Sequence, residues 1–176
     1  MLTSSSAGLY GQNLQAGYGA AKAAMMGLAR VLSVEGKRFH ISTNVVAPAA
    51  TTRIASSENL EVKSGPDAGK TPPQTFDMAP EYVSALVTYL CHGSCDASGT
   101  FYHAGGGWYG KVELLQANGL VLDDEALRDP SHASPEAVAA GFDQVTDLGA
   151  GAHINGPGNQ SLGTALTDAL KALPKL

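Results

Sequence analysis

Three residues near the amino terminus, Ser5, Tyr18 and Lys22, have the types and spacing of a proton-transfer site. Tyr18 and Lys22 are four positions apart, so a helix would place both side chains on one face, about one turn from each other. Because a neighbouring ammonium favours the ionised form of a phenol, such a pair suits general acid–base catalysis. Ser5 lies thirteen residues before Tyr18, and its hydroxyl can hold the oxygen of an alcohol or a carbonyl. The trio therefore indicates chemistry at an alcohol or carbonyl carbon.

The spacing of Tyr18 and Lys22 alone is a weak signal, because a tyrosine packed beside a solvated lysine has the same pattern. Average residue usage produces the three-residue pattern by chance in roughly one chain of this length in fifty. The context lowers that chance further, since Ser5 follows a β-prone run and Tyr18 falls in a predicted helix.

Strands must alternate with helices to position these residues, and the apolar pattern predicts that order. The predicted strands cover 2–6, 41–47 and 99–104, and the predicted helices cover 15–35 and 80–91. This alternation is typical of an α/β fold with a parallel sheet, here of about three strands, and right-handed crossovers. Ser5 would then lie at the carboxyl end of the first strand, where such sheets bind ligands.

The first long helix is predicted to bury one apolar stripe and to end in a glycine cap at Gly36. The stripe consists of Ala21, Ala24, Met25, Leu28 and Leu32. The segment 49–78 is rich in Thr, Ser, Gly and Pro. We expect a loop there, and loops of this length are usually functional or disordered.

From residue 111 onward the pattern changes, and we expect a mostly helical extension over 111–176. Its predicted elements are a short strand at 112–116, helices at 123–128, 134–145 and 161–173, and a flexible linker at 149–159. The helix at 134–145 has the most consistent signals, with Ser134 as N-cap and Pro135 at the first helical position. Residues 1–110 would form a partial catalytic domain.

Two further motifs favour structural roles over cofactor or metal chemistry. Gly105, Gly107 and Gly110 match the spacing of a dinucleotide-binding loop, but no capped helix follows them, so a strand that turns into the tail is favoured. Cys91 and Cys95 are spaced like a ligand pair on one helix face. Because no second pair stands at zinc-like spacing, two small buried thiols are favoured over a metal site.

The remaining candidates are imidazole and aromatic side chains. Apart from His92, which lies between the two cysteines, the histidines stand at no motif spacing, and we expect them to be surface or core residues; they are His40, His103, His132 and His153. Trp108 and Tyr109 could line a channel for an acyl chain, although simple packing is the preferred interpretation.

Composition excludes several classes of partner. The formal net charge is −5 and the eleven Lys and Arg residues are dispersed, so we expect no nucleic-acid binding. No apolar run approaches the ~20 residues of a membrane span, and the amino terminus lacks the pattern of a secretory signal. We expect a soluble intracellular protein. The choice between cytoplasm and peroxisome stays open, because the terminal Pro174-Lys-Leu differs from the peroxisomal signal Ser-Lys-Leu.

The stretch SSAGLYGQNLQAGYGAAK at 5–22, followed by NVVAP at 44–48, closely resembles the catalytic half of the short-chain dehydrogenases/reductases. The resemblance implies a Rossmann-like doubly wound parallel sheet, of which this chain would be the carboxyl-terminal half. It implies that Ser5 binds the substrate oxygen, Tyr18 relays the proton and Lys22 also holds the nicotinamide ribose. The cofactor contacts that it implies are those of Tyr18, Lys22, Pro48, Ala49 and Thr51.

Three further stretches resemble the 3-hydroxyacyl-CoA dehydrogenase region of the type 2 peroxisomal multifunctional enzymes. They are LCH at 90–92, AGGGWYGK at 104–111 and SPEAV at 134–138. This resemblance implies oxidation of a 3-hydroxyacyl-CoA to the 3-ketoacyl-CoA in fatty-acid oxidation, with hydride transfer to NAD. NADP is not excluded, and another small alcohol or ketone as substrate stays open.

Two departures from the family pattern limit these expectations. Ala49 replaces the glycine that follows the proline in most members, which leaves the backbone contacts there open. The amino-terminal half, with its Gly-rich phosphate turn, is not in the sequence. We therefore expect a fragment of a larger enzyme, inactive by itself, that forms a homo-oligomer or associates with the missing half. The alternative is a non-catalytic remnant or dimerisation module of the same family.

Overall fold

In the computed structural model of the chain, the described residues are 1–52, 77–122, 126, 129–149 and 153–155. The contacts divide the chain into two units, Met1–Val112 and Glu113–Leu176. Most of the predicted loop at 49–78, the body of the predicted helix at 123–128 and the predicted helix at 161–173 lie outside the described residues. The division at 110 that the sequence suggests is close to this boundary, but the partial-domain interpretation stays a prediction.

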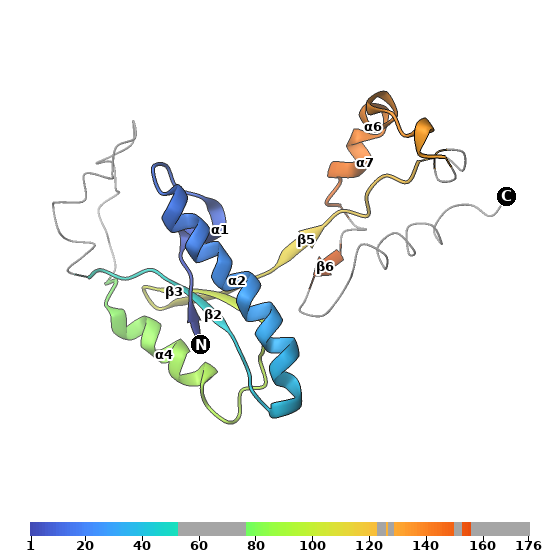
Figure 1. Ribbon diagram of the computed structural model, residues 1–176. Coiled ribbons are helices and arrows are strands. Elements are labelled where there is room, and N and C mark those ends of the chain that lie inside the picture. The colour runs from blue at the N-terminus through green and yellow to red at the C-terminus, as the bar shows by residue number, and fades with distance from the viewer. Residues whose placement is uncertain (53–76, 123–125, 127–128, 150–152, 156–176) are drawn as a thin grey trace. The chain divides into compact units, whose positions relative to one another are not determined.

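The first unit is a mixed sheet with helices on both faces (Figure 1). Its elements in chain order are β1 (Leu2–Thr3), α1 (Ser6–Tyr10), α2 (Ala16–Gly36), the 3₁₀ turn η1 (Lys37–Phe39), β2 (Val45–Pro48), α4 (Pro80–Leu90), β3 (Phe101–Gly105) and β4 (Trp108–Val112). The strand order is β1-β2-β3-β4. β1, β2 and β3 are parallel, and β4 pairs antiparallel with β3. The predicted α/β class is confirmed, with one antiparallel strand beyond the three parallel ones.

The additional strand β4 follows from a tight glycine turn. Gly106 and Gly107 have φ values of 56° and 77°, the left-handed pair that a two-residue hairpin of the I′ type requires. Gly105 must also lack a side chain, because a Cβ there would collide with the carbonyl oxygen of Ala49. The glycine run is therefore a hairpin turn between two strands, and no helix opens after it as a dinucleotide-binding loop would need.

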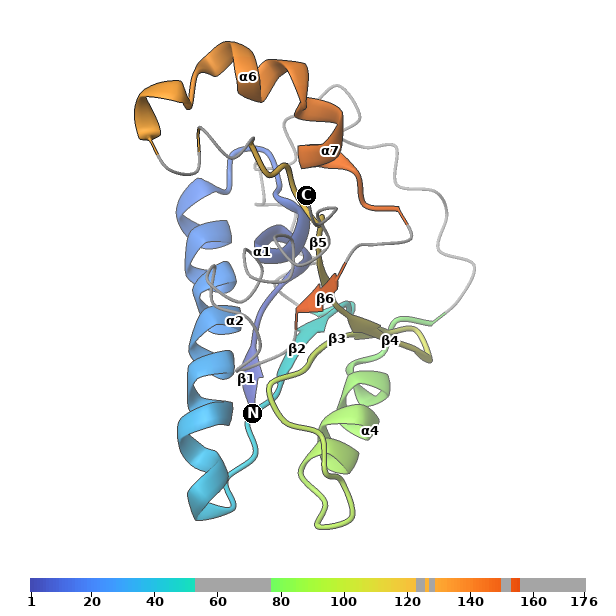
Figure 2. The same cartoon turned by 90° about the vertical axis from the view of Figure 1, so that its right-hand side faces the viewer.

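The two long helices cover opposite faces of the sheet (Figure 2). On the α2 face, Ala29, Val45 and Phe101 form one buried cluster. On the α4 face, the buried residues Val46, Leu90 and Ala104 form a second cluster, with half-buried side chains of α4 packed against it. Because neighbouring strand residues point to opposite faces, Val45 belongs to one cluster and Val46 to the other, as expected of a buried parallel strand.

Helix α2 turns a different face to the sheet from the one that its apolar pattern predicts. Its buried residues are Ala29, Ser33 and Gly36, whereas Leu28 and the two valines Val31 and Val34 are exposed. Small side chains let the helix axis approach the strands closely, and the larger apolar residues are left on the outer face. The prediction of a buried stripe through Ala21, Ala24 and Leu28 is therefore wrong.

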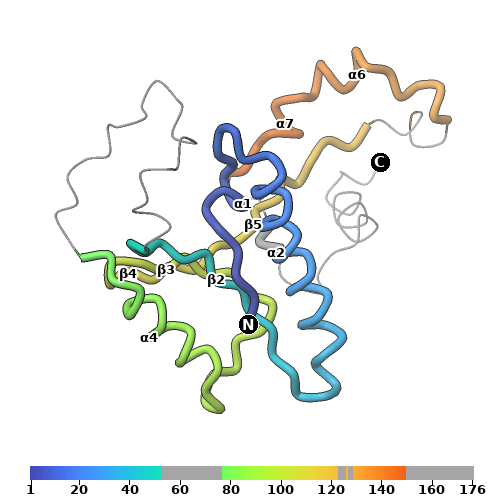
Figure 3. Tube along the Cα trace, turned by 60° about the vertical axis from the view of Figure 1, so that its left-hand side comes forward, coloured from blue at the N-terminus to red at the C-terminus, as the bar shows by residue number. Residues whose placement is uncertain are grey.

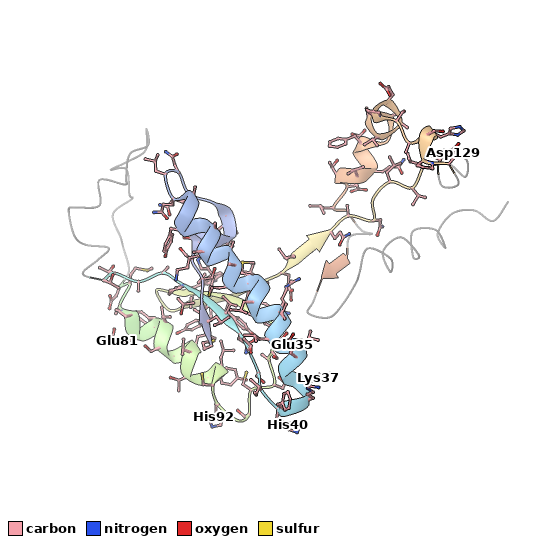
Figure 4. The ribbon with its side chains drawn as sticks, viewed as in Figure 1. Glu35, Lys37, His40, Glu81, His92 and Asp129 are labelled. Carbon is pink, nitrogen blue, oxygen red and sulfur yellow. The ribbon has the colours of Figure 1, made fainter. Side chains whose placement is uncertain are left out.

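Gly36 is not the left-handed cap that was predicted. Its φ is −72° and it continues the helix into η1, whereas His40, with φ 57°, takes the left-handed conformation that ends the turn. Glycine is needed at position 36 for another reason, since a Cβ would lie 2.8 Å from the carbonyl oxygen of Ile41. Lys37, His40 and Glu35 gather at this end of α2, away from α1 (Figure 4).

The second unit contains two short strands as well as helical turns. Its elements are β5 (Leu114–Gln116), the 3₁₀ turn η2 (Pro130–His132), α6 (Pro135–Ala140), α7 (Phe142–Thr146) and β6 (His153–Asn155). β5 and β6 pair antiparallel, so part of the segment predicted as a linker forms a strand and the described tail is not purely helical.

Two polar caps start the helical turns of the second unit. The predicted cap Ser134 accepts a hydrogen bond from the Ala137 amide at 3.1 Å, and the predicted single helix is divided in two at Gly141. Asp129 caps η2 (Figure 4). Hydrogen bonds from the backbone and then the side chain of Ser131 hold the pKa of the Asp129 carboxyl below its usual value.

We predict that Phe101→Ala destabilises the protein by about 3–5 kcal/mol, because it leaves a cavity in the cluster that joins α2 to the sheet. The side chain of Phe101 is 2% exposed, whereas Phe39 in the same unit is 60% exposed. Phe39→Ala is the matched control and should change the free energy of unfolding by no more than about 0.5 kcal/mol. Denaturant titration of both variants measures the difference, and equal effects would contradict the described core.

Candidate active site

Ser5 lies directly between the first strand and the first helix. β1 ends at Thr3, and Ser5 is the N-cap of α1, with its Oγ accepting a hydrogen bond from the Ala7 amide at 3.2 Å. The expected turn after the strand is thus a short helix, which lies at the end of the sheet where β1 ends (Figure 2). Since an accepting hydroxyl oxygen still carries its own hydrogen, Ser5 remains able to donate to a ligand.

Lys22 connects Tyr18 to the end of the same strand. Its Nζ donates to the carbonyl oxygen of Thr3 at 3.2 Å and lies 5.6 Å from the centroid of the Tyr18 ring. A second link comes from Ser4, whose buried hydroxyl donates to the Lys22 carbonyl oxygen at 2.8 Å. Tyr18 is 49% exposed, so its phenol is open to a ligand. Tyr18 and Lys22 therefore lie near Thr3, the last residue of β1. Ser4 and Ser5 follow Thr3 directly in the chain.

A close backbone approach fixes α1 against α2 at this point. A Cβ on Gly8 would lie 2.7 Å from the backbone carbon of Lys22 and 2.7 Å from the amide nitrogen of Ala23. One turn earlier in α2, a Cβ on Gly19 would lie 3.2 Å from the carbonyl oxygen of Ala7. The helix capped by Ser5 and the helix carrying Tyr18 are thus in backbone contact. Gly8 was not singled out from the sequence, because nothing local distinguishes it from a turn glycine.

The predicted cofactor residues Pro48, Ala49 and Thr51 follow the neighbouring strand. Pro48 is the last residue of β2. The amide of Ala49 donates to the carbonyl oxygen of Ala104 and the amide of Thr51 to that of Met78, each at 2.8 Å. Because both amides already have partners within the protein, any contact of these residues with a cofactor has to use side chains or carbonyl oxygens.

A cavity of about 550 Å³ lies beside this segment, on the α4 side. It is lined by Pro48, Ala50, Thr52, Pro80, Val83, Ser84, Val87 and Thr88. Neither Ser5 nor Tyr18 nor Lys22 lines it, so this cavity and the three polar residues are separate features of the described structure.

A group of rings that the sequence did not indicate lies on the other side of the sheet. The ring of His103 has its centroid 6.1 Å from that of Tyr10 and 6.2 Å from that of Trp108. Tyr10 and Trp108 are 68% and 61% exposed, so both rings are only partly packed against the protein. Tyr109 differs from it, because its hydroxyl donates to the carbonyl oxygen of Tyr82 at 2.9 Å.

Among the described residues, no three His, Cys, Asp or Glu side chains are grouped so that they could hold a metal ion. Cys95 is half-buried against the α4 cluster, but Cys91 is exposed at the helix end. The prediction of two buried thiols is therefore wrong for Cys91. No helix in the described part of the chain has both the length and the apolarity needed to cross a bilayer.

A sequence model of a family described as short chain dehydrogenase matches residues 1–62. Peroxisomal multifunctional enzyme A of Dictyostelium discoideum is 38% identical over 133 residues, which make up 73% of this chain and 27% of that enzyme. The chain thus spans about a quarter of the length of this relative.

Two solved structures are similar in fold. Full-length peroxisomal multifunctional enzyme type 2 from Drosophila melanogaster matches with a TM-score of 0.68 and 28% identity, covering 96% of this chain and 27% of that one. A short chain dehydrogenase from Mycobacterium avium matches with a TM-score of 0.56 and 31% identity, covering 82% of this chain and 43% of that one.

We predict that Gly8→Ala destabilises the protein by about 1–3 kcal/mol, the usual cost of overpacking, because the added methyl group meets the backbone of α2. Gly27→Ala is the matched control, since a Cβ on Gly27 meets nothing within 4 Å. In a helix interior that substitution should stabilise by roughly 0.5–1 kcal/mol. Thermal melts of the two variants test the contact, and a neutral Gly8→Ala would show that α1 does not press on α2.

Proposed function

We propose that Ser5, Tyr18 and Lys22 carry the proton-transfer chemistry of an oxidoreductase, a proposal supported by the match of residues 1–62 to the short chain dehydrogenase family. The substrate we propose is a 3-hydroxyacyl-CoA, oxidised to the 3-ketoacyl-CoA with NAD in fatty-acid oxidation. Similarity to multifunctional peroxisomal enzymes over most of the chain supports this choice of substrate. The observation that carries the proposal is the contact of Lys22 with both Tyr18 and the end of β1.

Each of the three side chains has a separate role in this reaction. Ser5 donates its hydroxyl hydrogen to the oxygen of the substrate and so positions the carbon that reacts. In the oxidation direction the ionised phenol oxygen of Tyr18 takes up the proton of the alcohol as the carbonyl forms, and in the reverse direction the phenol hydroxyl gives that proton back. The ammonium of Lys22 favours negative charge on the Tyr18 oxygen during the transfer, by Coulomb attraction.

The donors at this end of the sheet fit a nicotinamide dinucleotide. When bound, NAD accepts the hydride that leaves the alcohol carbon. The Lys22 ammonium has three hydrogens and uses one on the carbonyl oxygen of Thr3, so others are free to donate to ribose hydroxyls. Tyr18 would contact the same ribose, and Pro48, Ala49 and Thr51 would lie against the nicotinamide.

The outer face of α2 supports association as part of the working enzyme. Leu28, Val31 and Val34 recur at three-residue spacing and are all exposed, which forms an apolar stripe along one side of a helix. Exposed apolar stripes of this kind are typical of surfaces that pack against another polypeptide. We propose that this stripe is covered in the assembled protein, by a second copy or by a nucleotide-binding polypeptide.

We predict that Tyr18→Phe lowers kcat for 3-hydroxyacyl-CoA oxidation by about 10²–10⁴-fold, the usual contribution of a general acid–base group. NADH formation would be followed for this chain alone and for the chain co-expressed with the polypeptide encoded directly upstream of it. Tyr89→Phe on α4 is the matched control, because Tyr89 is exposed and lies on the helix that covers the opposite face of the sheet.

The control variant should oxidise the substrate at the rate of the unchanged protein. Equal activity of Tyr18→Phe and the unchanged protein would exclude Tyr18 as the proton acceptor. The chain alone and the co-expressed chain would each be tested, as folded protein, with NAD and with NADP. If neither preparation reduces either cofactor, the enzymatic proposal is contradicted and the non-catalytic remnant is favoured.

A further inference from the structure

The rings of Tyr10, His103 and Trp108 form one continuous surface, which we name the aromatic wall. Tyr10 is the last residue of α1, His103 lies in β3 and Trp108 begins β4. His103 is the middle member: its ring is tilted by 58° to the ring of Tyr10 and meets the indole of Trp108 edge-on at 81°. Both geometries are among those that aromatic pairs prefer.

The sheet register places His103 of this wall two strands away from Ser4, the residue before Ser5. Ala47 pairs with His103 and His103 pairs with Gly110. The β1 register, Leu2 with Val45 and Thr3 with Val46, continues by one residue to set Ser4 opposite Ala47. At ~4.8 Å between neighbouring strands, His103 lies roughly 10 Å from Ser4 along the carboxyl edge of the sheet.

The side chains of the three aligned residues Ser4, Ala47 and His103 point to the face of the sheet that α2 covers. Val45 and Phe101 belong to the cluster under α2, and residues two positions further on share their face. Ala47 and His103 therefore point to the side where Ser4 bonds to Lys22. α1 follows the end of β1 and lies next to α2 (Figure 3). The wall and the three proposed catalytic residues thus share one face and one edge.

The position of the indole is fixed from both sides of β4. Its ring lies across Gly110, because a Cβ on Gly110 would collide with carbon atoms of the Trp108 ring. On the opposite face of the strand, Tyr109 donates to the carbonyl oxygen of Tyr82 and ties β4 to α4. Glycine at 110 therefore leaves the space that the indole ring occupies.

A fixed aromatic surface that is left open to solvent indicates a ligand or a partner. An apolar ligand is favoured over a polar one, since the wall offers ring faces and a single imidazole. Continuity with Ser5 favours the substrate over a second polypeptide. Tyr10 stands five residues after Ser5, which caps the same helix, so at roughly 1.5 Å per residue the helix rises by about 7.5 Å from Ser5 to the wall.

We propose that the aromatic wall binds the apolar acyl chain of the substrate and sets the preferred chain length. This inference rests on the proposed function, because it assumes that the hydroxyl or keto group of an acyl-CoA binds at Ser5. A short acyl chain would not reach His103 and Trp108, whereas a long one would cover both rings. Long-chain substrates should therefore gain affinity from the wall and short-chain substrates should not.

Trp108 is the single tryptophan of the chain, so its fluorescence reports directly on the wall and needs no catalysis. The full chain would be titrated with hexadecanoyl-CoA below its micelle concentration, and with acetyl-CoA and free CoA as comparisons. We expect a saturable blue shift with hexadecanoyl-CoA alone. Gly110→Ala, which displaces the indole, should raise the apparent Kd for hexadecanoyl-CoA by about tenfold or more. Gly93→Ala, where a Cβ meets nothing within 4 Å, should leave it unchanged.

Kinetics on the active preparation separate a binding role from a structural one. Trp108→Ala should raise KM for the long-chain 3-hydroxyacyl-CoA by about tenfold or more, the effect of removing one well-packed aromatic contact. KM for the short-chain substrate and kcat for both should stay within about twofold of the unchanged protein. Trp108→Phe should restore most of the long-chain preference.

The outcomes distinguish the two proposals. No fluorescence response and equal KM values, in a protein that oxidises 3-hydroxyacyl-CoA, would overturn the wall and leave the function. A response specific to the long chain, in a protein without dehydrogenase activity, would overturn the function and leave an apolar-ligand site. A blue shift that grows with protein concentration, without added ligand, would show that a second copy covers the wall and would overturn the inference.

Discussion

The approach of α1 to α2 at Gly8 is the contact on which the rest of the site depends. A short helix begins at the end of β1, and its backbone touches the backbone of Lys22 because no side chain stands at position 8. The Ser4 hydroxyl and the Lys22 ammonium then join α2 to the same strand end. One glycine thereby brings the serine of one element and the tyrosine–lysine pair of another to a common edge.

Glycine performs a similar task at the opposite edge of the sheet, through three different physical effects. At Gly105 the absent Cβ allows contact with the Ala49 carbonyl, at Gly106 and Gly107 positive φ angles reverse the chain, and at Gly110 the open space receives an indole ring. The result is a short antiparallel strand that carries Trp108 on one face and Tyr109 on the other. The two faces differ in consequence, because the Tyr109 hydroxyl has a hydrogen-bond partner in α4, whereas the indole of Trp108 is exposed to solvent.

The spacing of apolar residues predicted where the regular elements lie, but it did not predict correctly which of their side chains are buried. The helices at 16–36 and 80–90 and the parallel strands lie close to their predicted ranges. The buried face of α2 was misassigned because apolar size was taken as the sign of burial, whereas close packing on a sheet selects the small residues Ala29 and Ser33. The strand after Gly106 and Gly107 was not predicted, although paired glycines between two β-prone runs are typical of hairpin turns.

The sequence by itself determined the α/β class and the order of its elements, because these depend on local periodicity, and its spacing singled out Ser5, Tyr18 and Lys22 as the proposed proton-transfer trio. Only the tertiary structure decided which rings stand beside that trio and which polar atoms already have partners. Tyr10, His103 and Trp108 are far apart in sequence and are brought together by strand register and by a turn. Such contacts are set by packing between elements, and no local pattern encodes them.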